Sequence, residues 1–269
     1  MTLAGYLEKI RQGKPVNYEN FLRCLPADIS ARHMLIFSTT RVGAQRWLVT
    51  CQEAGLIEKL QSAATKPDDR VAAAVLGNSH QTVSEAAILL VYHSLLVDSR
   101  PGVVYLSADE TVQDFKCKPL ALLIENQQNF VQSAAMLRIA SAFCGQLLTL
   151  ENTDVVYGGG SRVNSARITS WLSHYDDIIC AFDFDLGGLR MFRALKKRLG
   201  IQTTFLQPPD WAPFRDYFIY PPRTTKRFLQ AIDLATQLGF TGLAEVIHQT
   251  GHFMEQESLL AEPSALERL

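Results

Sequence analysis

Short aliphatic runs that alternate with helix-length amphipathic segments fill the second half of the chain, and this pattern restricts the fold more than any other feature. Runs of this kind, bounded by turn residues, are typical of buried strands in a parallel sheet flanked by helices. The sequence therefore predicts a βαβαβαβ unit. Its expected strands are 120–124, 154–157, 178–182 and 203–206, and its expected helices are 129–148, 162–172 and 188–199.

Acidic residues directly follow two of these expected strands. Glu125 comes after the first strand, and Asp183 and Asp185 come after the third. Residues at the carboxyl ends of parallel strands gather along one edge of the sheet, where ligands bind. We therefore expect the three carboxylates to converge.

Converging carboxylates repel one another, and a bound cation removes this repulsion. The Asp183-Phe184-Asp185 spacing directs both aspartates to one side of the chain, and no cysteine or histidine pair lies nearby. Oxygen ligands favour Mg²⁺ or Mn²⁺ over zinc, so we expect a divalent-metal site. In an alternative interpretation the aspartates cap the helix that starts near Gly188, but this accounts for only one of them.

Three consecutive glycines, Gly158 to Gly160, follow the second expected strand. The segment is not a dinucleotide-binding fingerprint, because Val163 stands where a third glycine is needed. We expect a tight turn beside the acidic edge, with Arg162 in contact with a phosphate.

The first 60 residues have apolar residues at helical spacing and carry eight Lys or Arg against five acids. The segment 38–59 begins with Ser and Thr, continues for the length of a helix and has Gly55 as a stop signal. It suggests the recognition helix of a winged-helix module, in which Arg41 and Arg46 bind DNA. A small helical bundle with solvated arginines is the alternative.

Residues 61–118 have a less regular pattern, which predicts a helix over 83–96 and a short strand over 103–106. We interpret them as a connector. The predicted domains are thus a winged-helix-like DNA-binding region at 1–118 and an α/β catalytic domain with C-terminal helices at 119–269.

The overall composition excludes several classes of protein. A net charge of −1 argues against a strongly cationic nucleic-acid coat protein, and the longest apolar stretch is too short to span a membrane. The five cysteines form no C-x-x-C motif, which argues against a disulfide framework or a structural zinc site. The first residues do not have the pattern of a signal peptide, so we expect a cytoplasmic protein with no membrane partner.

Three segments together resemble the sequence blocks of a Toprim domain. They are LLIENQQNF (122–130), VVYGGGSRVN (155–164) and CAFDFDLGGLRMF (180–192). With the winged-helix-like region in front, the chain is most similar to the A subunit of topoisomerase VI and its nuclease relatives. These relatives include the nuclease subunit, of the JetD or MksG type, of condensin-like Wadjet plasmid-defence complexes.

The resemblance implies a Toprim fold, which is Rossmann-like with a mainly parallel four-stranded core sheet. It implies that Glu125 is the catalytic general acid or base or else a metal ligand, and that Asp183 and Asp185 are catalytic metal ligands. The stretch 254–257 (MEQE) resembles a further acidic block, so Glu257 or Glu255 would complete the metal site. A solvated helix face is the alternative for this stretch. Asn126 stands where the wider family often has glycine, which weakens any comparison with primases.

A topoisomerase requires a nucleophilic tyrosine in its winged-helix region, but segment 38–59 contains none. We therefore expect hydrolysis of DNA phosphodiesters that depends on Mg²⁺ or Mn²⁺. The resemblance implies the nuclease subunit of an SMC/condensin-like complex, with plasmid DNA and the other subunits as partners, and a homodimer. A small Toprim RNase and a non-catalytic Toprim DNA-binding module are the alternatives.

Overall fold

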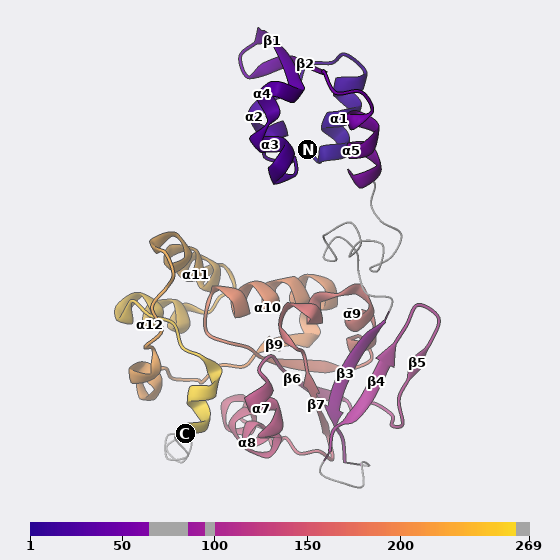
Figure 1. The fold of residues 1–269 in the computed structure, drawn as a ribbon. Helices are drawn as coiled ribbons and strands as arrows, with labels where there is room; N and C mark the ends of the chain where they lie inside the picture. The colour runs from indigo at the N-terminus through magenta and orange to yellow at the C-terminus, as the bar shows by residue number, and fades with distance from the viewer. Residues whose placement is uncertain (65–85, 95–99, 262–269) are drawn as a thin grey trace. The chain divides into compact units, whose positions relative to one another are not determined.

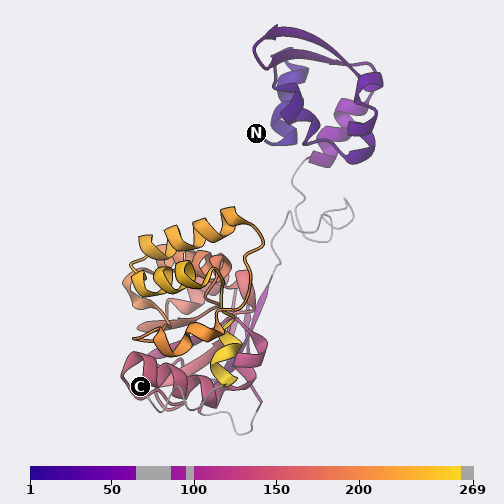
Figure 2. The same cartoon turned by 90° about the vertical axis from the view of Figure 1, so that its left-hand side faces the viewer.

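The computed structural model describes residues 1–64, 86–94 and 100–261 and separates the chain into two compact units (Figures 1 and 2). The first unit is Met1–Glu85 and the second is Ala86–Leu269. The boundary thus comes earlier than the one expected after residue 118. The reason is that three strands of the expected connector join the sheet of the second unit.

The N-terminal unit combines short helices with one hairpin around a small apolar core. Its buried centre includes Leu7, Phe21, Val49 and Leu60. Val16 and Trp47 exchange two backbone hydrogen bonds of 2.8 Å, which join the segment before the second helix to the hairpin. The elements are α1 (Leu3–Arg11), α2 (Tyr18–Leu22), α3 (Ala27–Ala31), α4 (His33–Ile36), β1 (Phe37–Gly43), β2 (Arg46–Cys51) and α5 (Leu56–Ala64).

The helix expected over 38–59 is wrong, because most of this segment forms the antiparallel β1–β2 hairpin. The segment is rich in β-branched Thr and Val, which favour strands, and Gln45 adopts a left-handed φ of 55° at the turn. Gly55 has a φ of 75° and precedes α5 instead of ending a helix. Arg41 and Arg46 are therefore strand residues near the hairpin turn, and both are exposed.

The second unit is built on a seven-stranded sheet in the order β5-β4-β3-β7-β6-β8-β9. The four strands β7, β6, β8 and β9 are parallel and confirm the predicted core sheet, whereas β3, β4 and β5 add to it antiparallel. The strands are β3 (Ala87–Tyr92), β4 (Gly102–Leu106), β5 (Thr111–Val112), β6 (Leu120–Ile124), β7 (Thr153–Tyr157), β8 (Asp177–Ala181) and β9 (Thr203–Phe205).

Strand β3 replaces the middle of the helix expected over 83–96; positions 83–85 and 95–96 lie outside the described residues. Leu89 and Val91 point into the core with the period of two that a strand requires. The helix prediction failed because the periodicity of such a short apolar run is the same for a buried strand and a buried helix. The strand expected over 103–106 is confirmed as β4.

Helices cover both faces of the sheet (Figure 1). Helices α9 and α10 lie on one face, and α7 and α8 lie on the other, as in other open α/β sheets. The helices are α7 (Gln127–Val131), α8 (Ser133–Cys144), α9 (Ala166–Leu172), α10 (Leu186–Leu199), α11 (Thr225–Gln237) and α12 (Thr241–Thr250), with 3₁₀ turns η2 (Gly160–Asn164), η3 (Gly200–Gln202), η4 (Ala212–Tyr217) and η5 (Gln256–Ala261). None of the helices in the described ranges is long and apolar enough to cross a bilayer.

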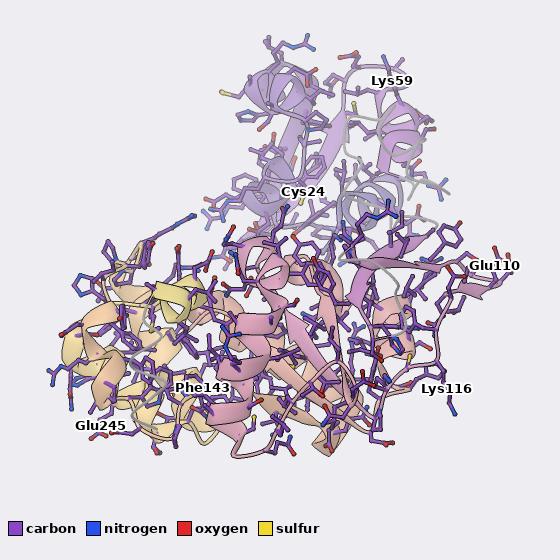
Figure 3. All side chains as sticks on the ribbon, turned by 90° about the horizontal axis from the view of Figure 1, so that it is seen from below. Cys24, Lys59, Glu110, Lys116, Phe143 and Glu245 are labelled. Carbon is purple, nitrogen blue, oxygen red and sulfur yellow. The ribbon has the colours of Figure 1, made fainter. Side chains whose placement is uncertain are left out.

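The proline-rich stretch 208–222 packs against its own unit. Trp211, Phe214 and Phe218 are buried, and Phe214 meets Phe143 of α8, which Figure 3 labels, edge to face at 5.6 Å between ring centres. The stretch then leads into a short pairing with the chain after α12, where Tyr220 and Phe253 exchange backbone hydrogen bonds of 3.1 and 2.8 Å. This pairing returns the end of the described chain to the sheet.

Candidate functional site

The first and third predicted strands are neighbours in the sheet and end at the same level, because Ile124 of β6 pairs with Ala181 of β8. Glu125 and Asp183 follow these two residues closely. The backbone N–H of Asp183 donates to Oε2 of Glu125 at 3.3 Å. The structure thus brings together two acids that lie 58 positions apart in the sequence.

The two aspartates have different partners. Asp185 is the N-cap of α10, and its Oδ1 accepts from the N–H of Gly188 at 2.9 Å. Asp183 does not cap the helix; its Oδ1 accepts from the N–H of Gln256 at 2.9 Å. The capping alternative is therefore correct for Asp185. Asp183 instead contacts Glu125 and the chain at Gln256.

Gly188 permits this arrangement of the strand end. A Cβ atom at position 188 would lie 2.1 Å from the carbonyl oxygen of Asp183, which is far inside van der Waals contact. Only glycine lets α10 begin directly against the backbone of Asp183.

A short segment after α12, residues 253–257, completes the cluster, and we call it the C-terminal strap. The N–H of Phe184 donates to the carbonyl of Met254 at 3.0 Å, so the strap runs antiparallel beside the end of β8. Glu257 accepts a hydrogen bond from Nδ2 of Asn126. Its other oxygen, Oε2, is buried and has no hydrogen-bond partner among the described residues.

Gln256 fixes the strap to the sheet through its side chain. Its amide fits in two orientations, and we assign the one that satisfies the backbone. In this orientation it donates to the carbonyl of Ala181 at 3.0 Å and accepts from the N–H of Phe182 at 3.3 Å. In the reverse orientation its oxygen lies 3.3 Å from Nδ2 of Asn129. These two hydrogen bonds attach the strap to the backbone at the end of β8. The strap therefore keeps Glu257 near Asp183.

Burial and neighbouring negative charges raise the pKa of two of these acids, Glu125 and Asp183. Burial, together with the charge of Asp183, raises the pKa of Glu125 to about 7. Burial, together with the charges of Glu257 and Asp185, raises the pKa of Asp183 to about 6, although the hydrogen bond from Gln256 opposes this. Ionisation of these two acids is therefore unfavourable, because their surroundings do not compensate the negative charge.

The donor set fits a hard divalent cation. Glu125, Asp183, Asp185 and Glu257 offer only oxygen atoms, which Mg²⁺ and Mn²⁺ prefer, and the unpartnered Oε2 of Glu257 is a buried acceptor that such an ion would satisfy. Within residues 1–64, 86–94 and 100–261, no three His, Cys, Asp or Glu side chains are already close enough to hold an ion. Binding an ion would therefore require these carboxylates to come closer together than they are in this structure.

The glycine turn lies beside Glu125, as expected. The N–H of Gly158 donates to the carbonyl of Ile124 at 2.7 Å, and Gly159 and Gly160 have left-handed φ values of 61° and 71°. Arg162 lies in η2, where Nη2 donates to the carbonyl of Ile88 at 3.2 Å. This arginine therefore contacts strand β3 in the described structure.

The two other expected DNA-binding residues belong to the N-terminal unit. The guanidinium of Arg41 lies 5.9 Å from the centre of the Trp47 ring, and Arg46 is exposed at the start of β2. The structure locates both arginines relative to other residues of the N-terminal unit only.

Tyr220 is a residue near the acids that the sequence did not indicate. Hydrogen bonding to Glu255 and the charge of that residue raise the pKa of Tyr220. Glu255 is therefore the partner of Tyr220, and Glu257 is the partner of Asn126. A Pro-rich segment such as 208–222 gives no signal for this contact, because the contact depends on the pairing of Tyr220 with Phe253.

No known protein-family model matches this sequence, and no curated protein matches it. We therefore infer function from the residues and their geometry.

Proposed function

We propose that this protein is a divalent-metal-dependent DNA endonuclease that hydrolyses phosphodiester bonds. One observation carries the proposal: acids from three separate segments, Glu125, Asp183 and Glu257, lie at the carboxyl ends of parallel strands, and Oε2 of Glu257 is buried without a hydrogen-bond partner among the described residues. Such an edge is where open α/β sheets bind ligands.

In this proposal Glu125, Asp183, Asp185 and Glu257 hold one or more Mg²⁺ or Mn²⁺ ions. A bound ion would orient the attacking water and neutralise charge on the scissile phosphate. Glu125 would transfer protons at its Oε2 or Oε1, a role that a carboxyl beside the scissile phosphate can take. Gln256 and Gly188 are positioning residues, because they hold the carboxylate and the backbone of Asp183.

The order of elements supports a Toprim domain in the second unit. A glutamate follows β6, a glycine turn follows β7 and an Asp-x-Asp-x-x-Gly sequence follows β8, and these strands are adjacent in the sheet. The sequence resemblance to Toprim nucleases rests on the same three segments. We assign residues 86–261 of the described chain to such a domain on this basis.

The order of elements in the N-terminal unit supports a winged-helix-like assignment. In it the segment expected to be a recognition helix forms a hairpin instead. The order is a helix, a single bridge at Val16, further helices and then the β1–β2 hairpin. In this assignment the hairpin is the wing, and Arg41 and Arg46 near its turn contact DNA phosphates. Segment 38–59 then contributes no recognition helix.

The biological setting in the proposal follows from the resemblance. It is the nuclease subunit of an SMC/condensin-like plasmid-defence complex, with plasmid DNA as substrate, the other subunits as partners and a second copy of the chain in a homodimer. Co-purification of the tagged chain with an SMC-type ATPase from its native host tests this part of the proposal. Recovery of the chain without such an ATPase would contradict it.

Incubation of supercoiled plasmid with the full chain and Mg²⁺ or Mn²⁺ tests the enzymatic activity. We expect nicked or linear DNA that does not form in EDTA. The double substitution Glu125→Gln, Asp183→Asn should lower the rate by at least about 100-fold. A matched control with the same change in charge is Asp176→Asn, Asp177→Asn, since both residues are exposed at the opposite end of β8; it should cut like the parent.

Two results would overturn the proposal. Equal cutting by the site variant and its control would mean that the acids are not catalytic, which favours a DNA-binding module without catalysis. Faster metal-dependent cleavage of a structured RNA than of plasmid would favour an RNase.

A further inference from the structure

Helix α10 carries an excess of positive charge that no ion pair compensates among the residues that the structure describes. Five of its 14 residues are Lys or Arg, and none is acidic. Since the whole chain has a net charge of −1, these cations are concentrated locally. Arg190, Arg193 and Lys197 recur at intervals of three and four residues, which places them along one exposed side of the helix.

The start of α11 extends this charged surface. Nη2 of Arg190 donates to Oε1 of Gln230 at 3.1 Å, so the exposed side of α10 borders α11. Lys226 lies one turn before Gln230 on the same side of α11, and Arg223 precedes the N-cap Thr224. We call Arg190, Arg193, Lys197, Arg223 and Lys226 the basic stripe.

The basic stripe lacks anionic partners in the described structure. None of its five side chains forms an ion pair with an acid among residues 1–64, 86–94 and 100–261. Asp233 of α11 accepts from Gln237 and forms no ion pair with the stripe. Neighbouring cations without counter-charges repel one another, and a polyanion that lies along them removes this repulsion.

Both helices that carry the stripe begin close in sequence to residues of the acidic site. Helix α10 begins at its cap Asp185, one and a half turns before Arg190. Arg223 lies three residues after Tyr220, which contacts Glu255 of the strap. From Arg190 to Lys197 the helix advances about 10 Å, which equals about three phosphate steps along one strand of a duplex.

We propose that the basic stripe is the track along which duplex DNA enters the acidic site, with its phosphates on Arg193, Lys197, Arg223 and Lys226. This inference rests on the proposed nuclease function. It goes beyond it because it adds a continuous DNA-binding surface on α10 and at the start of α11 to the contacts proposed for Arg41, Arg46 and Arg162.

Binding to DNA in the absence of divalent metal tests the track independently of cleavage. The probe is a 30-base-pair fluorescein-labelled duplex, titrated with the full chain in EDTA at 50 to 250 mM salt and read by fluorescence anisotropy. The test variant is Arg193→Gln, Lys197→Gln. Its matched control, Lys116→Gln, Arg138→Gln, removes the same charge from exposed residues before β6 and on α8, which covers the opposite face of the sheet (Figures 1 and 3).

We expect the test variant to bind at least about tenfold more weakly than the parent at 100 mM salt. Its plot of log affinity against log salt should be shallower by about 2, because each phosphate contact contributes about 0.9. The control should bind within about twofold of the parent. Equal losses in the two variants, or a parent that does not bind DNA, would overturn the proposal.

Two further arms identify the polyanion. Tighter binding of a double-stranded RNA of equal length, with the same loss in the test variant, would overturn the assignment to DNA. Displacement of the duplex by an equal charge concentration of polyglutamate would show that the stripe accepts acidic protein, which also overturns it. In a further outcome, the parent fails to cut plasmid and still binds DNA in a way that the test variant weakens. This result would refute the nuclease function but support the basic stripe as a DNA-binding track.

Discussion

Replacing Glu125 with Gln should stabilise the metal-free protein at pH 8. Folding raises the pKa of this carboxyl from 4.5 to about 7, mainly through burial and the charge of Asp183. Between these values the unfolded chain has released a proton that the folded chain retains, so stability falls as pH rises from about 4.5 and through 7. Below pH 4.5 the carboxyl is protonated in both states and contributes no difference.

The pKa change corresponds to an upper limit of about 3 kcal/mol at pH 8. Because Glu125 is only partly buried, solvent screening reduces this to about 1–2 kcal/mol. Gln cannot ionise, and its carbonyl oxygen still accepts from the N–H of Asp183. The variant should therefore gain about 1–2 kcal/mol at pH 8 and nothing at pH 4.5.

Urea unfolding in EDTA measures this gain. A Trp47→Phe background leaves Trp171 and Trp211 as the fluorophores, and both are buried in the second unit, so the fluorescence reports that unit alone. Glu151→Gln is the matched control, because Glu151 is an exposed acid just before β7, and it should unfold like the parent. Mg²⁺ should stabilise the parent more than the Glu125→Gln variant.

The reasoning would be refuted by a Glu125→Gln variant that is less stable than the parent at pH 8, or by a stability difference that does not change between pH 4.5 and pH 8. Either result would mean that the neighbouring carboxylates do not oppose the ionisation of Glu125. The electrostatic argument for a cation at this edge would then be lost.

Two other substitutions probe the surroundings of the acids. Gly188→Ala should destabilise the second unit by about 1–3 kcal/mol and abolish cutting, since its Cβ would meet the carbonyl of Asp183; an unchanged melting temperature would contradict this. Tyr220→Phe should slow plasmid cutting several-fold without weakening DNA binding, because it removes the hydroxyl beside Glu255. Tyr105→Phe, an exposed tyrosine on β4, is its control, and equal rates in the two variants would exclude a role for Tyr220.

The parallel part of the fold was predictable because its strands are buried on both faces. Runs such as 120–124 and 178–182 are continuous apolar segments between turn residues, a pattern that surface strands do not have. The same reasoning located Glu125 and Asp183, since neighbouring parallel strands end at one edge.

The β1–β2 hairpin and β3 were mispredicted for a common physical reason. Ser, Thr and Gly punctuate helices and hairpins alike, and a six-residue aliphatic run fits a strand or a buried helix. Only the partner strands decide between them: β2 pairs with β1, and β3 pairs with β4 and β7. Such pairing depends on tertiary contacts that the local pattern does not contain.

Contacts of the C-terminal strap were the least accessible to sequence reasoning. The resemblance suggested Glu255 or Glu257, but the choice depends on Asn126, which lies 131 positions away from Glu257. Tyr220 meets Glu255 only because residue 220 pairs with residue 253. No helical or strand period links such residues.

The strap also determines when during synthesis the acidic edge exists. Residues 125 and 183 leave the ribosome well before residues 253–257, and the sheet from β3 to β9 is complete without them. A nascent or clipped chain that ends before Phe253 would have the sheet but would lack Glu257 and the anchor of Asp183. Full assembly of the acids is thereby delayed until nearly all of the described polypeptide has been made.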